Sequence, residues 1–461
     1  MTLIKSISGI RGTIGGQVGE GLSPIDIVKF TSAFGAWLQD KNNAKKLTLV
    51  VGRDARISGP IVNDIVIASL RSLGINVVDL GLSTTPTVEM AVTMEKAHGG
   101  IILTASHNPK EWNALKLLNE KGEFISSQDG LDVLDIAEKE SFEYADVDSL
   151  GKVSYKNDYI QKHIDAVIKL PFVDTESIKK ADFHIVVDAV NSTGGIAIPL
   201  LLHALGVDNV DGIHCEPTGE FAHNPEPLPA HLVDLSETIL EKKADLGITV
   251  DPDVDRLAMV CEDGSMFGEE YTLVAVADYV LSQKGGATVS NLSSTRALRD
   301  VTEKHGYQYF ASAVGEVNVV AKMKEVNAII GGEGNGGVIL PDLHYGRDAL
   351  VGIAIFLTLL AKKNVSASEL RDSYPKYTIS KNKIQLTPEV NVDKVLLDMA
   401  KKYSQQEVDS TDGVKIYFEK EWVHLRKSNT EPIIRIYAES ESGEKADQLA
   451  NNIMTEIKNI I

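Results

Sequence analysis

Four short polar segments of this 461-residue chain carry residue types that could do chemistry. In the first, an apolar run ending at Leu103 opens into Thr-Ala-Ser-His-Asn-Pro at residues 104–109, and Lys116 follows shortly afterwards. A hydroxyl exposed at the end of a strand is a candidate nucleophile, which singles out Ser106. The alternative is a plain turn, because Ser, Asn and Pro are common turn residues.

The second segment places three aspartates at alternate positions after an apolar run. Residues at i, i+2 and i+4 of an extended chain share one face, so we expect Asp251, Asp253 and Asp255 to converge. Their mutual repulsion calls for a divalent cation, and hard oxygen ligands favour Mg²⁺ or Ca²⁺. Two alternatives are a solvated acidic turn and an EF-hand loop ending at Glu262. Arg256 stands where the EF-hand requires glycine, which argues against the second.

The third segment, Gly-Gly-Glu-Gly-Asn-Gly-Gly at residues 331–337, sets one carboxylate and one amide among glycines. Glycines let the backbone approach a ligand closely, and Glu333 and Asn335 could hydrogen-bond vicinal hydroxyls. Taken alone, the segment is also typical of a flexible turn. It is no dinucleotide fingerprint, because the required strand-to-helix spacing is missing.

The fourth segment, residues 424–437, surrounds a tight turn with two arginines. Arginines, hydroxyls and turn amides together make a phosphate cradle, although such arginines are often surface salt bridges. A confined cationic cluster is informative in a chain whose formal net charge is -19. The side chains expected to hold phosphate are Arg426, Ser428, Asn429, Thr430 and Arg435.

Three arginines near the start of the chain are further candidates. Arg11 lies among glycines, so its guanidinium could reach a ligand, and we rank it as the active-site residue of the three. Arg53 and Arg56 follow an apolar run, and we expect them to brace the serine loop.

Composition excludes several classes of function. The net charge argues against a nucleic-acid or anionic-membrane partner, since both need a basic face. Cys215 and Cys261 form no CxxC pair, which argues against a disulfide framework or a zinc site and favours a reducing cytoplasm. The first residues lack the apolar core of a signal peptide. The longest apolar run, residues 349–361, is shorter than the roughly 20 residues of a membrane span and predicts a buried helix.

The elements that must position these segments recur in the sequence. Three times, apolar strands run into short polar loops containing glycine, which predicts three related α/β domains with largely parallel sheets. Ligands collect at the carboxyl ends of such strands, where the polar segments stand. The last stretch reads strand, helix, strand, strand, helix and predicts an α+β domain. The expected domains are residues 1–155, 156–257, 258–371 and 372–461.

Taken together and in this order, the four segments resemble the α-D-phosphohexomutase superfamily of phosphoglucosamine mutases, phosphoglucomutases and phosphomannomutases. The resemblance covers nearly the whole chain and implies four domains around a central cleft. It implies that Ser106 is a phosphoserine and that one Mg²⁺ per subunit is held by that serine phosphate and the three aspartates. Lys116 and Arg11 would lie beside the transferred phosphoryl group. Glu333, Asn335, Arg256 and His107 would contact the sugar, and the 426–435 segment would hold phosphate.

The sequence departs from the superfamily pattern in two segments. Many relatives have Asn-Gly where this chain has Asn113 and Ala114. The sugar segment commonly carries a serine where Asn335 stands, often with a histidine close behind, so that role would fall to another residue such as His344.

The resemblance implies a cytoplasmic mutase, monomeric or homodimeric, that moves a phosphoryl group between the 6- and 1-positions of a hexose. A hexose 1,6-bisphosphate would be its intermediate and activator. The form of residues 331–337 and 344–348 is most similar to archaeal-type phosphoglucosamine mutases, with a phosphoglucomutase or phosphomannomutase as the alternative. Two other classes are a non-catalytic protein that binds Mg²⁺ and a phosphosugar, and a phosphatase with Asp251 as nucleophile.

Overall fold

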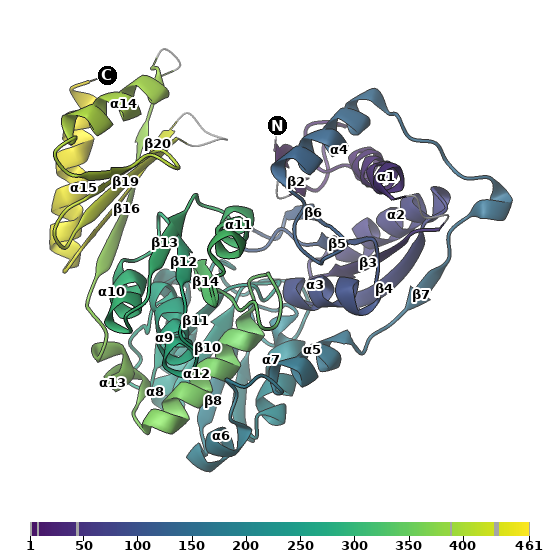
Figure 1. Ribbon diagram of the computed structural model, residues 1–461. Coiled ribbons are helices and arrows are strands. Elements are labelled where there is room, and N and C mark those ends of the chain that lie inside the picture. The colour runs from purple at the N-terminus through teal and green to yellow at the C-terminus, as the bar shows by residue number, and fades with distance from the viewer. Residues whose placement is uncertain (1, 7–8, 43–45, 388–389, 428–432, 461) are drawn as a thin grey trace. The chain divides into compact units, whose positions relative to one another are not determined.

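The protein divides into two compact units in the computed structural model (Figure 1). The first unit comprises Met1–Thr272 and Gly336–Ser368, and the second comprises Leu273–Asn335 and Glu369–Ile461. The structure describes residues 2–6, 9–42, 46–387, 390–427 and 433–460. Among these residues no helix is both long enough and apolar enough to cross a membrane.

The first sheet of the first unit follows the order β1-β2-β6-β5-β3-β4-β7. Strands β5, β3, β4 and β7 pair in parallel, and β6, β2 and β1 continue the sheet in antiparallel pairs. The strands are β1 (Ile4–Ser6), β2 (Gly9–Thr13), β3 (Thr48–Arg53), β4 (Asn76–Leu82), β5 (Gly99–Leu103), β6 (Trp112–Leu118) and β7 (Val153–Tyr155).

Helices cover both faces of this sheet. Leu49 and Val51 of β3 pack in one core with α1, α2 and α4, whereas Val50 packs in another with α3 and Tyr159 of α5. Alternate side chains of a strand point to opposite faces, which explains why β3 is apolar throughout. The helices are α1 (Pro24–Lys41), α2 (Gly59–Ser72), α3 (Thr85–Met94), α4 (Ser127–Lys139) and α5 (Tyr159–Val167), with a short 3-10 turn η1 (Val147–Ser149).

The second sheet, also in the first unit, has the order β11-β10-β8-β9. Its strands are β8 (His184–Asp188), β9 (Asn209–Ile213), β10 (Leu246–Val250) and β11 (Leu257–Cys261), of which β11 is antiparallel to β10. Leu235 and Ile239 of α8 pack against Val186 and Val260 on one face. The helices of this region are α6 (Thr175–Ala181), α7 (Gly194–Ala204), the 3-10 turn η2 (Pro229–His231) and α8 (Val233–Lys242).

Strand β15 (Gly337–Ile339) and helix α12 (Ala349–Lys363) complete the first unit. Every residue of α12 from Ala349 to Leu360 is buried, which confirms the helix predicted from the long apolar run. Asp348 caps this helix by accepting hydrogen bonds from the backbone N–H groups of Leu350 and Val351.

The second unit contains a parallel sheet in which β12 lies between β13 and β14. These strands are β12 (Thr288–Asn291), β13 (Tyr309–Ser312) and β14 (Ile330–Glu333), with helices α10 (Ala297–Lys304) and α11 (Glu316–Val326). Helix α9 (Glu269–Gln283) begins in the first unit and continues into the second.

The parallel strands of these three sheets repeat one topology, which confirms the predicted related α/β domains. In each, the first strand of a set lies between the third and the second: β5-β3-β4, β10-β8-β9 and β14-β12-β13. The loops of Ser106 and of Asp251 follow the third strand of their sets, and Glu333 ends the third strand of the last. The polar segments therefore occupy equivalent places, at the carboxyl ends where ligands bind such sheets.

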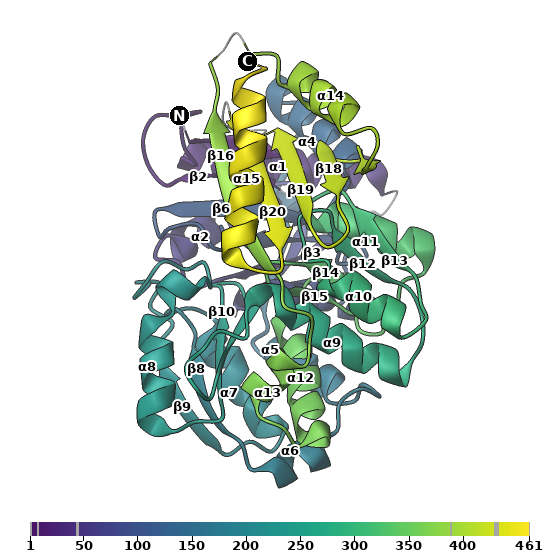
Figure 2. The same cartoon turned by 90° about the vertical axis from the view of Figure 1, so that its left-hand side faces the viewer.

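The remaining sheet of the second unit is antiparallel, with the order β16-β20-β19-β18-β17. Figure 2 shows α15 lying across this sheet. Four strands lie between α14 and α15, whereas the sequence pattern predicted two strands there, so that prediction was wrong. Two of the strands were hard to recognise, because β17 has only three residues and a short turn joins β18 to β19. The elements are α13 (Ala367–Asp372), β16 (Thr378–Gln385), α14 (Val392–Lys402), β17 (Glu407–Asp409), β18 (Val414–Tyr417), β19 (Trp422–Lys427), β20 (Ile433–Ser440) and α15 (Gly443–Lys458).

Candidate active site

Ser106 stands in the loop between β5 and β6, almost buried, with its hydroxyl directed at a carboxylate. Its Oγ donates a hydrogen bond of 2.6 Å to Oδ2 of Asp251. Its backbone is left-handed, with φ of 49°, a conformation that costs energy for a residue other than glycine and often marks a functional position. The Ser106 N–H donates to Oγ1 of Thr104 over 2.9 Å, which helps to hold this turn.

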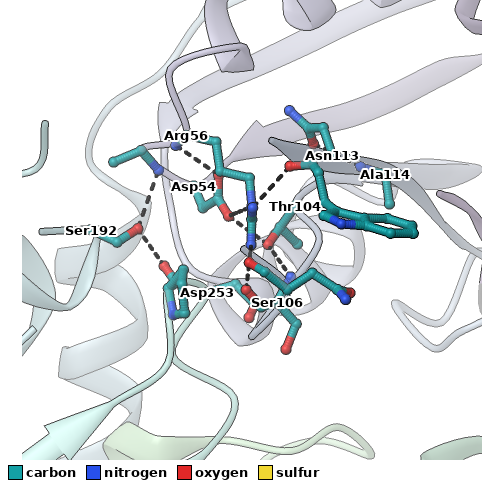
Figure 3. Close-up of polar contacts among 12 residues, drawn as sticks. Asp54, Arg56, Thr104, Ser106, Asn113, Ala114, Ser192 and Asp253 are labelled. Atoms are coloured by element: carbon teal, nitrogen blue, oxygen red, sulfur yellow. Dashed lines mark hydrogen bonds and ion pairs between the residues drawn. The ribbon is translucent and has the colours of Figure 1, made fainter. Parts of the chain in front are cut away.

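Arg56 braces the serine loop, as predicted. Its guanidinium is fully buried and donates to four backbone carbonyls, those of Ser106, Asn108, Pro109 and Trp112. Its Nε also pairs with Asp54 at 3.0 Å, and Asp54 accepts from Thr104 as well (Figure 3). The Arg53 guanidinium bonds the carbonyl of Asp54 instead.

The three aspartates converge, and they do so through a turn. Asp251, Asp253 and Asp255 are fully buried, and one carboxylate oxygen from each lies within 4.8 Å of the others. The chain leaves β10 into this turn, where Val254 adopts a left-handed φ of 63°. The backbone N–H groups of Asp255 and Arg256 both donate to Oδ1 of Asp251. The extended chain assumed from the alternate spacing was wrong, although the expected convergence is present.

Cationic and hydroxyl groups from distant parts of the first unit surround this triad. Lys116 Nζ lies 2.7 Å from Oδ2 of Asp253 and 3.7 Å from Oδ2 of Asp255. Arg347 Nη2 donates to Asp255 over 2.7 Å, and Thr85 Oγ1 donates to Asp253 over 2.6 Å. The Arg256 Nε lies 3.9 Å from both Asp251 and Asp255.

The pKa values of Asp251 and Asp253 are shifted in opposite directions. Burial, followed by the neighbouring carboxylates of Asp255 and Asp253, raises the pKa of Asp251 well above its usual range. Burial alone would also raise the pKa of Asp253, but the charge and hydrogen bond of Lys116 outweigh it and lower that pKa. Burial opposes the charge on Lys116, yet Asp253 and Asp255 raise its pKa and keep it a cation.

The triad fits a hard divalent cation. Among the described residues, Oδ1 of Asp253 and Oδ1 of Asp255 are buried without a hydrogen-bond partner. A buried carboxylate oxygen without a partner is costly, and a cation with oxygen preference would satisfy both. The EF-hand alternative does not hold, because β11 follows the turn and Glu262 accepts hydrogen bonds from Ser368.

Arg11 and Lys116 lie on one face of the first sheet. Arg11 of β2 is the direct cross-strand partner of Ala114 in β6, two residues from Lys116. Side chains alternate between faces along a strand, so the three point the same way. Ala114 stands in a regular ladder, so the glycine that many relatives carry there is not needed for this backbone.

His107 follows the serine directly. Its Nδ1 lies 3.4 Å from Oγ of Ser106. Burial, with Arg256 as the next cause, lowers the pKa of His107 to about 2, so the ring is neutral. A neutral imidazole can donate one hydrogen bond and accept another.

His344 belongs to a buried network of four side chains, Glu89, His163, His344 and Asp348. Its Nε2 lies 3.2 Å from Oδ2 of Asp348, and its Nδ1 lies 3.3 Å from Oε2 of Glu89. His163 Nε2 lies 2.8 Å from the same Asp348 oxygen. We call these four residues the histidine network.

In the second unit, Glu333 ends β14 and is buried. Its Oε1 accepts from Nδ2 of Asn291 over 2.7 Å and from the N–H of Gly315 over 3.0 Å. The next residue, Gly334, donates its N–H to Oγ of Ser294. These bonds fix the path of the chain that carries Asn335.

Arg426 and Arg435 are direct cross-strand partners in β19 and β20. Lys383 of β16 is the partner of Arg435 on its other side, so three cations share one face of the antiparallel sheet. Adjacent like charges are destabilising unless an anion balances them. Asp412 balances one of them, at 2.8 Å from Arg426 Nε. Ser428, Asn429 and Thr430 of the predicted phosphate segment lie outside the described residues.

The first unit thus brings together six of the residues singled out in the sequence, Ser106, the three aspartates, Lys116 and Arg256. Sequence reasoning missed Thr85 and Arg347, which contact the triad directly. It also missed Lys383 beside Arg435. No local signal marks any of them, because each is a common residue type whose neighbours in the fold come from remote segments.

Family models match the chain along most of its length, in the order of the four sheets. They are the phosphoglucomutase/phosphomannomutase α/β/α domains I, II and III, over residues 3–144, 161–264 and 268–377, and the C-terminal domain of the same family, over residues 386–456.

Curated relatives and a solved structure agree with these models. A phosphoglucomutase/phosphomannomutase of Thermococcus kodakarensis is 37% identical over 94% of this chain and 95% of its own. A phosphoglucosamine/phosphogalactosamine mutase of Sulfurisphaera tokodaii is 33% identical over 98% of each chain. A Burkholderia thailandensis phosphoglucomutase/phosphomannomutase family protein superposes with a TM-score of 0.84 at 25% identity, covering 100% of this chain and 98% of its own.

The fold is that of the phosphosugar mutases. The chain belongs to the phosphoglucomutase/phosphomannomutase family of the α-D-phosphohexomutase superfamily.

Proposed function

We propose that this protein interconverts the 6- and 1-phosphates of a hexose through a phosphoryl group carried on Ser106. The observation that carries the proposal is the 2.6 Å hydrogen bond between the Ser106 hydroxyl and Asp251, one member of a buried carboxylate triad. A serine phosphate at this place would lie next to the oxygens best suited to hold a cation. Membership of the mutase family supports the same role.

The triad and the Ser106 phosphate would hold one Mg²⁺ per subunit, because both supply hard oxygen ligands. When bound, this ion would neutralise charge on the oxygens of the transferred group. The two partnerless oxygens of Asp253 and Asp255 support this assignment.

The chain's own residues position and stabilise the reacting groups. A free hydroxyl of the hexose phosphate attacks phosphorus, the bond from phosphorus to Ser106 Oγ breaks as the new one forms, and the hydroxyl proton passes to an acceptor. Lys116 is held as a cation by Asp253 and Asp255, so it would stabilise developing negative charge and could accept a proton only after giving one up. Arg11, on the same face of the sheet, would add a second cation.

The product of this half-reaction is a hexose 1,6-bisphosphate, which returns its other phosphate to Ser106 after turning round. Traces of the bisphosphate would therefore activate unphosphorylated enzyme. Glu333, Asn335, Arg256 and His107 are proposed to contact the sugar. Arg426 and Arg435 are proposed to hold the phosphate that is not reacting, together with Ser428, Asn429 and Thr430.

Glucosamine phosphate is the proposed sugar, in line with the form of the glycine-rich segment and with the Sulfurisphaera tokodaii relative. Glucose and mannose phosphates form the second candidate, which the 37% identical Thermococcus kodakarensis relative favours. The monomeric or dimeric state and the cytoplasmic location stay predictions. A non-catalytic binding protein and an Asp251 phosphatase remain the alternatives to be tested.

The test measures interconversion of glucosamine, glucose and mannose phosphates with Mg²⁺ and a trace of bisphosphate. Wild type is compared with Ser106→Ala and with Ser126→Ala, an exposed serine that caps α4. We expect turnover and an intact-mass increase of one phosphoryl group in wild type and Ser126→Ala, and neither in Ser106→Ala. Turnover that survives Ser106→Ala would exclude the phosphoserine mechanism, and absence of turnover in wild type with all three sugars would favour the binding protein.

A further inference from the structure

A second cluster of potential metal ligands lies at the carboxyl edge of the second sheet, built from Asp188, His214 and His223. Asp188 ends β8 and is fully buried, and His214 follows β9. Oδ2 of Asp188 lies 2.9 Å from Nε2 of His223, and its Oδ1 lies 3.4 Å from Nδ1 of His214. The function proposed above uses none of these three residues. We call them the Asp188 centre.

The hydrogen bonds of His223 place its Nε2, an acceptor in the neutral ring, opposite a carboxylate oxygen, which is also an acceptor. Nδ1 of His223 lies 2.8 Å from the carbonyl oxygen of Asn224, which can only accept, so Nδ1 carries a proton. The Nε2 of a neutral ring is then bare, yet it faces the Asp188 carboxylate at 2.9 Å. Either a second proton makes this ring a cation, or a metal ion is bound by both atoms.

The distances suit shared coordination. Two ligand atoms at about 2.0–2.2 Å from one ion lie roughly 2.9 Å apart at a right angle and roughly 3.4 Å apart at the tetrahedral angle. The separations of 2.9 Å and 3.4 Å from Asp188 match these values. The two separations involve different oxygens of Asp188, so the carboxylate would bind the ion through both of them. One ligand atom from each of the three residues lies within 4.8 Å of the others, which lets them share one ion.

The outer nitrogens of both imidazoles face oxygen acceptors, as those of metal-binding histidines generally do. His223 Nδ1 is bonded to the Asn224 carbonyl. His214 Nε2 lies 3.6 Å from Oδ2 of Asp234, in the first turn of α8. These contacts orient the rings with one nitrogen each toward Asp188.

The backbone around the cluster is unusual. Val190, Asn191 and His214 all have left-handed φ angles, of 46°, 54° and 50°. For the β-branched Val190 this conformation is an outlier, and such outliers gather at functional sites. The Val190 N–H donates to Oδ1 of Asp188, and the Asn191 N–H donates to the carbonyl of His214, so the strained residues hold the ligands in place.

We propose that Asp188, His214 and His223 bind a zinc-class divalent cation at a site separate from the acidic triad. Two imidazole nitrogens and one carboxylate suit Zn²⁺ or Co²⁺, whereas Mg²⁺ prefers oxygen ligands alone. The side chains of His214 and His223 are 23% and 14% exposed, which leaves a path for the ion and room for water as a further ligand. This set needs no cysteine, because imidazole and carboxylate ligands alone can hold such an ion.

The ion would fix a segment that reaches the catalytic loops. Glu220, between the two histidines in the sequence, pairs with Lys110 at 2.8 Å, and Glu226, three residues after His223, lies 3.5 Å from Arg256. Lys110 belongs to the serine loop, and Arg256 follows the triad. The role of the bound ion is therefore structural, to position this segment, and no bond of the substrate changes at it.

Without the ion, protons would take its place. Burial would raise the pKa of Asp188, but hydrogen bonds from His214 and His223 outweigh it and lower that pKa to about 2. The same carboxylate raises the pKa of His214, and it does so for His223 against the opposing effect of burial. Because Nδ1 of His223 donates to a carbonyl and its Nε2 faces a carboxylate, a metal ion bound at Nε2 would replace the proton held there.

The test is dialysis of the purified full chain against Zn²⁺ in a large excess of Mg²⁺, which keeps Zn²⁺ out of the acidic triad. Metal content is measured by elemental analysis, and affinity and proton release by calorimetry in two buffers of different ionisation enthalpy. The variants are His223→Gln and His214→Gln. The matched control is His184→Gln, a histidine of the same sheet whose Nε2 contacts Asp211 at 2.9 Å.

We expect wild type and His184→Gln to bind one Zn²⁺ with release of at least one proton. Loss of a direct ligand should weaken binding about 100-fold or more in each of the other two variants. Circular dichroism checks that each variant is folded. The measurement of Zn²⁺ bound to wild type tests the proposal even if a variant fails to fold. The proposal is overturned if wild type retains no Zn²⁺ under these conditions, or if His223→Gln and His214→Gln both bind it as tightly as wild type.

Discussion

The acidic triad and the histidine network are both buried in the first unit, yet their charges are arranged in opposite ways. In the histidine network, Oδ2 of Asp348 faces both imidazoles and its Oδ1 accepts two backbone N–H groups of α12. His163 is completed on its other side by Oγ1 of Thr87, 3.0 Å away. The acids and bases of this network balance one another.

The triad is not balanced in this way. The pKa of Asp251 is raised by burial and by its neighbours, and oxygens of Asp253 and Asp255 lack hydrogen-bond partners among the described residues. Burial is common to both clusters and so does not by itself identify a binding site. The distinguishing feature is that three carboxylates, with no histidine among them, converge within 4.8 Å of one another, an arrangement that favours a cation with oxygen preference.

The largest expected effect comes from Asp251→Asn in the triad. Loss of one metal ligand should lower turnover by roughly 10³-fold, since a bound metal contributes several kcal/mol to the transition state. Without Mg²⁺, the variant should be at least as stable as wild type, because it removes a carboxyl group crowded by two others. Turnover assays and thermal unfolding with and without Mg²⁺ check both points. Equal stabilisation of variant and wild type by Mg²⁺ would contradict the assignment.

Asp348→Asn in the histidine network should act on stability instead. Removing one partner of a buried ion pair leaves the other uncompensated and should lower the free energy of unfolding by about 3–5 kcal/mol. The loss should be the same with and without Mg²⁺. The control is Asp158→Asn, an exposed acid paired with Lys162, which should change stability by less than about 0.5 kcal/mol. Urea unfolding measures the stability of wild type and of both variants. A loss of stability in Asp348→Asn that depends on Mg²⁺ would contradict the distinction between the histidine network and the triad.

The smallest expected effect is a pH dependence of stability from His344. Burial opposes its charge, but Asp348 and Glu89 raise the pKa of His344 to about 10. The unfolded value is about 6.5, so this stabilisation is complete below about pH 6.5 and is lost as pH rises through 10. The free energy of unfolding should fall by on the order of a few kcal/mol over this window.

The measurement is urea unfolding of wild type and His344→Gln across that pH range. Other groups titrate near its upper end, so the difference between the two profiles isolates His344. The variant should show the flatter profile. Parallel profiles would mean that His344 carries no extra proton in the folded protein.

Local sequence pattern was enough to predict the repeated α/β architecture. Apolar strands running into polar loops with glycine give β3, β4 and β5 and their counterparts in the other two parallel sheets. The same pattern located the loops of Ser106, Asp251 and Glu333, because each follows or ends a strand at equivalent positions. The domain boundaries at residues 155, 257 and 371 stay predictions, as do the roles assigned to the site residues.

The groups that surround the triad could not be predicted, for a physical reason. Thr85 begins a helix, and Arg347 precedes another, so neither has a local pattern that sets it apart from a capping or surface residue. Their contacts with Asp253 and Asp255 join segments far apart in the chain. The left-handed Val254 was equally hidden, since valine does not favour that conformation.

Arg56 has a consequence for how this enzyme can diverge. Its guanidinium holds the serine loop through the carbonyls of Ser106, Asn108, Pro109 and Trp112, and every amino acid carries such a carbonyl. The anchorage is therefore indifferent to most side chains of the loop. Substitutions at Asn108, Pro109 and Trp112 should therefore leave this anchorage intact, whereas loss of Arg56 or of its partner Asp54 would release the loop that carries Ser106.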